Sequence, residues 1–456
     1  MNTLKIHFLG ASGTVTGSKF LLETPERNIL IDCGMFQGLK ELREQNWKEL
    51  PFDVSRIDTV LLTHGHLDHT GYLPRLVKQG FTGKIFGTAP TLEITKIILL
   101  DSAKINEEDA ERANEESYSK HQPALPFYTV EDAERTIKMF VPAEKDAWHS
   151  FSENCRYRFK YNGHIIGATF IELELYGKTF VFSGDVGRKE DLLLFPPEKP
   201  QGADYLFLES TYGGKLHPAE GVSDKLIALI NKTVHNRGTL IIPSFAVERL
   251  QTLMFLLWEL YNERRIPNIP IFIDSPMGNN VLGVFERFAS WHKIPQAEFS
   301  AMKHRMNSIK SYKETWETID DPRPKIVIAG SGMVTGGRVL TYMKQLIDEP
   351  TTTILMVGYQ AEGTRGRQLL EGAHELRFFG KYYPVKATVE HIESLSAHAD
   401  QNGILDWLSE IKNVPENTFL IHGELTALDA LRVKIQDVYD WRVTLPKLYS
   451  TVEVSI

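Results

Sequence analysis

Short apolar runs separated by polar turn residues dominate the first part of the chain. Three of these runs have the length of strands and are bounded by turn-forming residues, as expected of strands joined by hairpins: Lys5–Leu9, Lys19–Leu22 and Asn28–Ile31. Thr59–Leu62 predicts a further strand, and helical spacing begins at Gly71 and continues to Lys78. Residues 64–70 are therefore expected to form a loop between a strand and a helix.

Longer helical segments and a second group of strands follow. The charged, alanine-containing stretch from Thr91 to about Lys120 predicts a long helix. Thr129, with Asp132 three residues later, predicts the start of a second helix with a capping box. Arg156–Val186 then returns to a β pattern.

From Ser223 onward, strands alternate with helices. The expected strands are Thr239–Ile242, Ile269–Ile273, Lys325–Ala329 and Thr352–Val357, and the helices between them include Lys225–Thr233, Ala246–Asn262 and Asn280–Trp291. This alternation predicts βαβ units and a parallel sheet. We therefore expect an α/β protein in which residues 209–374 form an inserted domain. Residues 375–456, which include a last helix at Ala427–Val438, are expected to return to the domain begun by residues 1–208.

Composition and charge exclude several classes of protein. The hydrophobic content of 42% is typical of a globular chain, and the net charge of −8 gives no general attraction to nucleic acid or anionic membranes. Any site for a polyanion must therefore be local. No apolar run approaches the roughly 18 residues that span a bilayer, and the start of the chain lacks the pattern of a signal peptide. With two cysteines, Cys33 and Cys155, at most one disulfide could form. We expect a soluble cytoplasmic protein with no membrane partner.

The loop between residues 64 and 70 carries the clearest candidate chemistry. His64, His66, Asp68 and His69 place three imidazoles and one carboxylate within six residues. In an extended backbone His64 and His66 point the same way and can share one metal ion, while Asp68 and His69 turn away from them, which favours two ions. The alternative interpretation is a solvated polar loop. Two further candidate ligands end or flank β segments, His164 in Asn-Gly-His-Ile-Ile-Gly and Asp185 in Phe-Ser-Gly-Asp-Val-Gly.

Together these residues resemble the motif series of the metallo-β-lactamase superfamily, which also includes Asp32 after the strand Asn28–Ile31. The resemblance implies an αββα sandwich that binds two Zn²⁺ ions. It assigns His64, His66 and His164 to one ion, Asp68 and His69 to the other, and Asp185 as the bridge, with Asp32 orienting a ligand. The donors are all nitrogen or oxygen, which suits zinc and also manganese or iron. We interpret Cys33 as a small buried apolar residue.

The inserted domain narrows the resemblance to the β-CASP branch of that superfamily, whose members act on nucleic acids. Three further motifs match it: Glu209 before Ser-Thr-Tyr-Gly, His398 in Ser-Ala-His-Ala-Asp, and His422 in Leu-Ile-His-Gly-Glu. In that branch a histidine at the last motif is typical of RNA-directed members, and DNA-directed members usually carry valine. The resemblance thus implies a zinc-dependent ribonuclease acting on single-stranded RNA, with His422 as a metal ligand and His398, paired with Glu209, as general acid. It also makes a homodimer a candidate assembly.

The inserted domain offers candidate contacts to phosphate. Ser244, Asp274, Ser331 and Gly358 each follow an apolar strand, at the edge where doubly wound sheets collect ligands. The glycine-rich segment 330–338 could present amides and a guanidinium to phosphate. Four residues are the candidates: Ser331, Arg338, Arg365 and Arg367. The alternative for each arginine is a solvated surface side chain. We assign the segment Gly10–Gly17 to a glycine-rich hairpin, because no helix follows it as a phosphate loop requires.

Three other functions stay open on the sequence. A DNA-directed nuclease is the nearest, and a thioester or ester hydrolase with the same metals is the next, although the insert has no role in hydrolysing a small ester. The third is a catalytically silent RNA-binding subunit, which the complete set of candidate ligands disfavours. The sequence leaves both endonuclease and 5′-to-3′ exonuclease action open.

Overall fold

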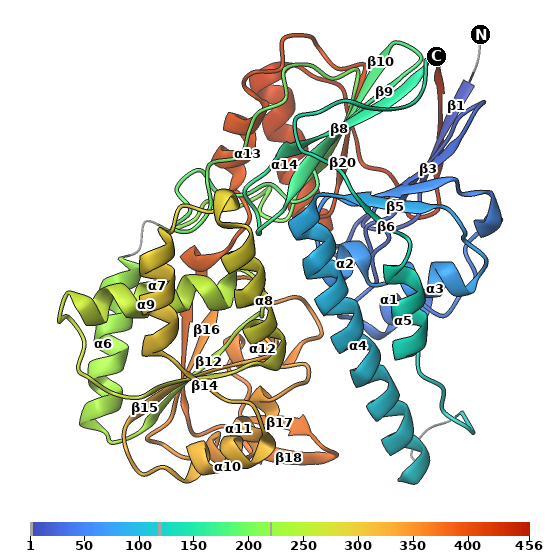
Figure 1. Cartoon of the computed structure of the whole chain (residues 1–456). Helices are drawn as coiled ribbons and strands as arrows, with labels where there is room; N and C mark the ends of the chain where they lie inside the picture. Colours follow the sequence, from blue (N-terminus) through green and yellow to red (C-terminus); the bar gives the residue numbers. More distant parts are fainter. Residues whose placement is uncertain (1–2, 117–120, 219–220) are drawn as a thin grey trace. The chain divides into compact units, whose positions relative to one another are not determined.

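The computed structural model describes residues 3–116, 121–218 and 221–456, which form two compact units (Figure 1). Residues 1–216 and 398–456 belong to the first unit, and residues 217–397 belong to the second. The second unit thus begins and ends later than the expected residues 209 and 374. Glu209 ends β11 (Tyr205–Glu209), a strand of the first unit, whereas β19 (Thr388–Ile392) pairs with β16 (Thr353–Val357) in the second.

Two seven-stranded sheets form the centre of the first unit. The first sheet has the strand order β22 (Thr451–Ser455), β1 (Thr3–Phe8), β2 (Phe20–Glu23), β3 (Asn28–Ile31), β4 (Thr59–Leu61), β5 (Lys84–Gly87) and β6 (Phe140–Pro142). The second has the order β21 (Val443–Thr444), β20 (Asn417–Ile421), β11, β10 (Lys178–Phe182), β9 (Thr169–Leu175), β8 (Cys155–Tyr161) and β7 (His149–Ser152). β1 and β2 pair antiparallel, which confirms the glycine-rich hairpin between them.

Helices cover the outer faces of both sheets. The first sheet packs in one apolar cluster with α3 (Leu73–Lys78), α4 (Ala89–Glu115) and α5 (Val130–Ile137), and α1 (Lys40–Gln45) and the one-turn helices α2 (Leu67–Thr70) and η1 (Val54–Arg56) lie in its loops. The second sheet packs against α13 (Gln401–Leu408) and α14 (Leu425–Tyr439). The four layers confirm the expected αββα sandwich. None of the helices in the described residues has the length and hydropathy needed to cross a bilayer.

Local sequence signals account for several of these elements and fail at one. Thr129 and Asp132 form the capping box at the start of α5, as predicted. The prediction of a loop throughout residues 64–70 is wrong, because Leu67–Thr70 forms one helical turn. The Thr70 hydroxyl donates to the carbonyl of His66 at 2.9 Å, and the Gly71 N–H donates to Leu67 at 2.7 Å. These polar contacts close the turn without the apolar spacing that signals a helix. The last residues expected in the helix of α4, 117–120, lie outside the described part of the chain.

The second unit is built on a parallel six-stranded sheet, as expected from the βαβ pattern. Its strand order is β14 (Asn307–Ser308), β13 (Ile271–Asp274), β15 (Lys325–Ala329), β12 (Thr239–Pro243), β16 and β19. The surrounding helices are α6 (Val222–His235), α7 (Arg249–Asn262), α8 (Pro276–Arg287), α9 (Gln296–Arg305), α10 (Tyr312–Asp320), α11 (Val339–Leu346) and α12 (Arg365–Leu370), with short turns η2 (Ala289–Trp291) and η3 (Glu393–Leu395). A separate antiparallel hairpin pairs β17 (Glu375–Phe378) with β18 (Lys381–Pro384).

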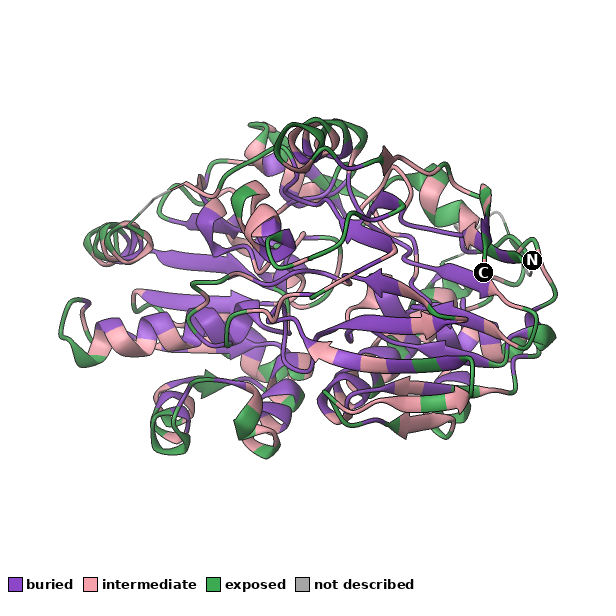
Figure 2. Cartoon of the chain, turned by 90° about the horizontal axis from the view of Figure 1, so that it is seen from above, coloured by how far each residue is buried: buried purple, intermediate pink, exposed green. Residues whose placement is uncertain are grey.

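Aromatic side chains fill the space between the two sheets of the first unit. The rings of Phe182 and Phe207 stack with their centroids 4.0 Å apart, and Phe419 lies 5.1 Å from Phe207 and 5.2 Å from Phe8. The strands of each unit are coloured mostly as buried in Figure 2. Since the strands end in the loops that carry the polar site residues, this aromatic core fixes the spacing of those loops.

Phe207→Ala tests the role of this aromatic core. We expect it to lower the free energy of unfolding by about 3–5 kcal/mol, because it removes a fully buried ring and leaves a cavity. Val414→Ala is the control, since the Val414 side chain is 68% exposed, and should change stability by less than about 0.5 kcal/mol. Denaturant unfolding, followed by tryptophan fluorescence, measures both. Equal stability of the two variants would contradict the proposed role of the aromatic core.

Candidate metal centre

The candidate ligands of the first unit lie where strands of both sheets end. Asp32 follows β3 directly, and Thr63–His69 follows β4 after one residue. In the second sheet His164 follows β8, Asp185 follows β10, and His422 follows β20. β3 runs parallel to β4, and β10, β11 and β20 run parallel to one another, so these loops gather at one edge of the sandwich.

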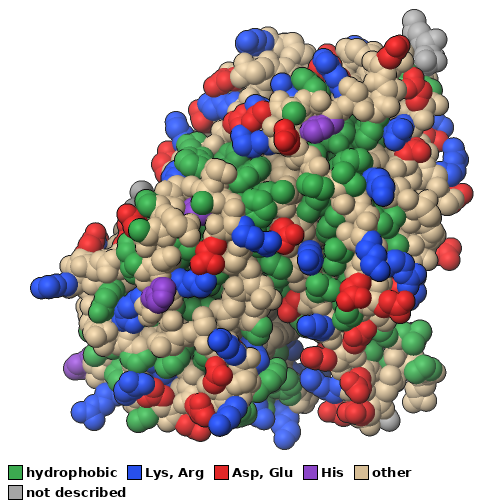
Figure 3. Space-filling view, in the orientation of Figure 1, with side chains coloured by type: hydrophobic (Ala, Val, Ile, Leu, Met, Phe, Trp, Pro, Cys, Tyr) green, Lys and Arg blue, Asp and Glu red, His purple; other side chains and the backbone are tan. Residues whose placement is uncertain are grey.

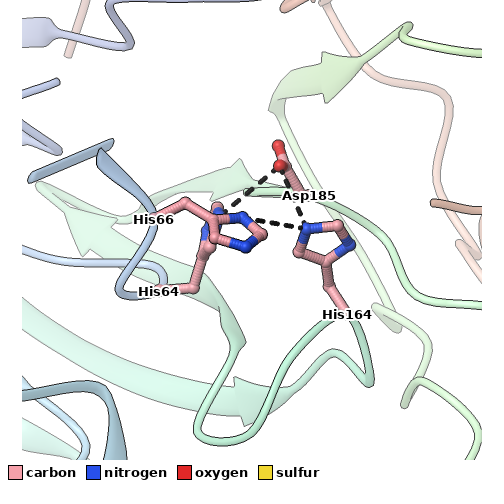
Figure 4. Close-up of side chains that lie close together, drawn as sticks. All are labelled: His64, His66, His164 and Asp185. Carbon is pink, nitrogen blue, oxygen red and sulfur yellow. Dashed lines mark hydrogen bonds and ion pairs between the residues drawn. The ribbon is translucent and has the colours of Figure 1, made fainter. Parts of the chain in front are cut away.

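Three histidines and one aspartate converge in the first group of donors, whose ligand atoms all lie within 4.8 Å of one another (Figure 4). Nε2 of His64 and Nε2 of His164 are each 3.4 Å from Oδ2 of Asp185. Nδ1 of His66 lies 3.1 Å from Nε2 of His64 and 3.3 Å from Nε2 of His164. The structure therefore brings together the four residues that the family resemblance implies for one metal and its bridge.

The second group consists of Asp68, His69 and His422 and has the same compactness. Nε2 of His422 lies 3.2 Å from Nε2 of His69 and 3.4 Å from Oδ2 of Asp68. Oδ1 of Asp185 is 3.3 Å from Nε2 of His69. The two oxygens of Asp185 thus face one donor group each, which is the geometry of a bridging carboxylate.

Hydrogen bonding and charge show that these groups fit a cation. Within the described residues, the buried Oδ1 of Asp185 has no hydrogen-bond partner of acceptable geometry. Burial, together with the nearby His69, lowers the pKa of His64 well below its usual value, and burial lowers the pKa of His66 to about 4. Burial alone would raise the pKa of Asp185, but His422 and His69 hold it well below the ordinary range. His64 and His66 are therefore neutral beside an ionised carboxylate, which are the protonation states that bind zinc. Burial opposes a charge on His69, but Asp185 and Asp32 raise its pKa well above the usual value, so a cation bound there would displace a proton.

Asp32 and Thr63 orient His64 and His69 through hydrogen bonds to their Nδ1 atoms. Asp32 accepts hydrogen bonds from the Thr63 amide and hydroxyl, each at 2.8 Å, and its Oδ2 lies 2.7 Å from Nδ1 of His69. Because the Thr63 hydroxyl donates to Asp32, it can accept from Nδ1–H of His64, which is 3.1 Å away. Both contacts hold the proton on Nδ1 and leave Nε2 of each histidine free to bind a cation.

Thr211 plays the same part for His422. Its hydroxyl lies 3.2 Å from the carbonyl oxygen of His422, to which it donates, and 3.1 Å from Nδ1 of the same residue. Nε2 of His422 is thereby left facing Asp68 and His69. Sequence reasoning missed both threonines, although each stands beside a motif residue, since Thr63 precedes His64 and Thr211 follows Glu209 by two positions.

Asn162 is a third residue that sequence reasoning missed. Its buried side-chain amide donates to the carbonyls of Ser183 and Asp185, each at 2.6 Å, and so ties the loop of His164 to the loop of Asp185. A lone asparagine near a strand end gives no signal of this role in a single sequence.

Glu209 and His398 form a hydrogen-bonded pair beside Asp185. Oε1 of the fully buried Glu209 accepts from the Val186 amide at 2.7 Å and lies 3.1 Å from Nδ1 of His398, while Oε2 accepts from the Thr211 amide at 3.1 Å. Nε2 of His398 lies 3.9 Å from Oδ2 of Asp185. Burial opposes a charge on His398, but Glu209 and Asp185 together raise its pKa to about 9. Both oxygens of Glu209 are engaged in hydrogen bonds, so we interpret the pair as a dyad that holds a proton.

The four phosphate candidates lie in the second unit, and the described chain already engages each of them. The Ser331 hydroxyl accepts from the amides of Thr335 and Gly336, and Nη1 of Arg338 donates to the Thr315 hydroxyl at 2.8 Å. Arg365 donates to backbone carbonyls, and Arg367 donates to Glu371 at 2.7 Å. Contact of these residues with phosphate stays a prediction.

Cys33 and Cys155 are free, buried thiols. Cys33 packs in the apolar cluster beneath the first sheet, and burial raises the pKa of its thiol to about 12. These observations agree with its interpretation as a small apolar residue beside the donor groups.

Comparison with known families finds three matching models along the chain. A model of the metallo-beta-lactamase superfamily matches residues 13–234, and a model of the Beta-Casp domain matches residues 250–369. A third, described as a Zn-dependent metallo-hydrolase RNA specificity domain, matches residues 382–446.

Two relatives are similar over nearly their whole length. A ribonuclease of Thermus thermophilus is 34% identical over 435 residues, covering 94% of this chain and 95% of that protein. An RNase J-like protein of Methanocaldococcus jannaschii is 31% identical over 433 residues, covering 93% of each. A crystal structure of a protein of unknown function from Enterococcus faecalis aligns with a TM-score of 0.54 at 12% identity, covering 99% of this chain and 100% of that one, which supports the fold alone.

Thr63→Val tests the orienting network. The change keeps the side-chain shape but removes the hydroxyl between Asp32 and His64, so we expect zinc affinity to fall about 10- to 100-fold. Competition with a zinc-binding dye measures the loss. Thr59→Val is the matched control, because the Thr59 hydroxyl bonds to Lys84 on the neighbouring strand at 3.1 Å and should leave zinc affinity unchanged. Equal affinities in the two variants would refute the role of Thr63.

Proposed function

The chain belongs to the β-CASP family of the metallo-β-lactamase superfamily and is a metal-dependent hydrolase; from this premise we propose that it hydrolyses the phosphodiester bonds of single-stranded RNA. The observation that carries the proposal is Asp185, whose two carboxylate oxygens face two separate donor groups beside the Glu209–His398 pair. The 34% identity to a ribonuclease over nearly the whole chain supports the same activity.

We assign two Zn²⁺ ions to the two donor groups. His64, His66 and His164 would hold one, Asp68, His69 and His422 the other, with Asp185 between them. When bound, such ions lower the pKa of a coordinated water to near neutral and stabilise negative charge on phosphoryl oxygens.

The protein's own residues position and protonate the reacting groups. Asp32, Thr63 and Thr211 keep the liganding histidines in one tautomer, so that the donor atoms need no rearrangement. Glu209 accepts the Nδ1–H of His398, which leaves Nε2 on the side of Asp185. A proton on that nitrogen can pass to the leaving oxygen when the P–O bond breaks.

RNA is favoured over DNA by two features of the last segment. His422 occupies the position that the family resemblance associates with RNA-directed members, and it lies within residues 382–446, which match the RNA specificity model. A reducing compartment such as the cytoplasm suits the two free, buried thiols. The homodimer stays a prediction.

Asp185→Ala tests the proposed activity directly. Zinc-loaded protein is incubated with 5′-labelled single-stranded RNA and with DNA of the same sequence, and the products are resolved by length. We expect RNA to be cleaved, and the variant to lose at least about 100-fold in rate because both donor groups lose a carboxylate. The lengths of the products then distinguish internal cleavage from removal of nucleotides at the 5′ end.

Two outcomes would contradict the proposal. Cleavage of DNA as fast as RNA would indicate a nuclease without the proposed specificity. If neither strand is cleaved by protein that retains its zinc, a small-ester hydrolase or a silent binding subunit becomes the better interpretation.

His398→Ala separates proton transfer from metal binding. We expect turnover to fall by about 10²- to 10⁴-fold while zinc content stays at the parent level. His398 lies outside the two groups assigned to zinc, and although it forms a third group of suitable spacing with Asp185 and Glu209, its Nδ1 is engaged by Glu209. Elemental analysis and RNA cleavage measure the two properties on the same sample. Glu209→Gln should retain zinc as well and lose less activity. Loss of zinc from the His398 variant would make His398 a ligand instead.

A further inference from the structure

The β17–β18 hairpin of the second unit carries aromatic side chains that the proposed catalytic site does not use. Its inner face is part of the core: Leu376 and Phe378 are buried in the cluster around α11, and the Phe378 ring stacks on Tyr383 with centroids 4.3 Å apart. Burial therefore explains this half of the hairpin. We call β17, β18 and the turn between them the aromatic hairpin.

Burial in the core does not explain two rings on the outer side of the aromatic hairpin. Phe379 is 52% exposed and Tyr382 is 61% exposed. Phe379 also has a φ of +50°, followed by Gly380 at +75°, in a two-residue turn between the strands. Such turns favour Asn-Gly or Asp-Gly, and a bulky side chain at positive φ is rare. The Phe379 ring meets the buried Phe378 ring edge-on at 6.2 Å between centroids, but about half of it stays exposed and the backbone preference opposes phenylalanine, so the outlier indicates a function.

Cationic side chains surround these rings. Arg377 pairs across the hairpin with Tyr382, and its guanidinium carbon is 5.8 Å from the ring centroid. Lys381 follows the turn and is exposed, as is Lys386 beyond the second strand. Residues 375–386 contain three basic residues and one acidic residue, in a chain whose net charge is −8. On the face shown in Figure 3, side chains of both signs of charge are interspersed. Binding a polyanion therefore requires a local excess of basic residues, such as the excess in the aromatic hairpin.

Arg365 anchors the aromatic hairpin to the loop that follows β15. Its Nε donates to the carbonyl of Arg377 at 2.7 Å, and its Nη1 donates to the carbonyls of Val334 and Thr335, each at 3.2 Å. The same loop ends in Arg338, whose guanidinium carbon lies 3.6 Å from the ring centroid of Tyr312, a residue that is 59% exposed. The hairpin thus has a fixed support in this loop, whose far end carries a second aromatic–arginine pair, and little ordering is left to occur on binding.

We propose that the aromatic hairpin binds single-stranded nucleic acid, with Phe379 and Tyr382 stacking on bases and Arg377 and Lys381 contacting phosphates. Exposed rings beside cations suit this ligand, because every base offers a face for stacking and the backbone supplies the negative charge. Three basic residues against one acidic residue in this segment favour a polyanion over a protein partner, whose interface core is depleted in charged residues. The proposal rests on the proposed function only in taking RNA as the natural ligand.

The variants Phe379→Asn and Tyr382→Thr test the proposal without disturbing the hairpin. Asparagine suits positive φ and threonine suits a strand, so both remove the ring while keeping the local backbone preference. Tyr449→Asn is the matched control, because Tyr449 is also an exposed aromatic residue, 43% exposed with a φ of +62°, but lies in the first unit.

The measurement is the anisotropy of a fluorescein-labelled 20-nucleotide single-stranded RNA titrated with the full-length protein. All variants carry Asp185→Ala so that the RNA is not consumed, and each is also tested without Asp185→Ala for RNA cleavage. We expect the double hairpin variant to raise the Kd roughly tenfold or more, and the Tyr449 control to leave it unchanged. A Kd within twofold of the parent would overturn the proposal.

Failure of the hairpin proposal and failure of the proposed function give different results. If the parent protein cleaves RNA and the hairpin variants bind RNA as the parent does, the hairpin proposal falls and the ribonuclease stands. If no protein cleaves RNA but the hairpin variants lose RNA binding, the hairpin proposal stands and the ribonuclease falls. Light scattering tests the alternative that the hairpin binds a second copy of the chain. If the hairpin variants change the mass of the assembly but not the Kd for RNA, the proposal is overturned.

Discussion

The carboxylate of Asp185 is the interaction on which the rest of the site depends. It is buried, it is held in its ionised form by His422 and His69, and its two oxygens reach His64 and His69 at 3.4 Å and 3.3 Å. An ionised carboxylate removed from water is stable only beside positive charge and hydrogen-bond donors. This charge lies between two groups of donors. It accounts for the histidine-rich surroundings, for the threonines that orient the histidines, and for the suitability of the site for a cation.

The sandwich keeps this arrangement rigid by attaching each donor to the end of a different strand. Aromatic packing between the sheets, such as the stacked Phe182 and Phe207, sets the distance between those strand ends. Hydrogen bonds across the edge, from Asn162 to the loop of Asp185 and from Thr63 to Asp32, fix the loops themselves. Stability and function are therefore coupled in the first unit, whereas the proposed nucleic-acid contact of the aromatic hairpin belongs to the second unit.

The sequence alone predicted the parts of this structure that depend on local pattern. The histidine cluster, the strand ends and the capping box of Thr129 are contiguous signals, and the structure brings together the donors that they suggested. The sequence did not predict contacts between segments that lie far apart along the chain. The helical turn at Leu67–Thr70 is closed by polar bonds, β19 joins the second unit by pairing with β16, and Arg365 is engaged by carbonyls far along the chain. No period or spacing in the sequence encodes such contacts.

The central claim is that two cations share Asp185, and X-ray diffraction at the zinc absorption edge tests it most directly. Crystals of the zinc-loaded protein, measured on both sides of the edge, should show two anomalous peaks on either side of the Asp185 carboxylate. One peak should be surrounded by His64, His66 and His164, and the other by Asp68, His69 and His422. A single peak, or a peak bound to Glu209 and His398, would contradict the account.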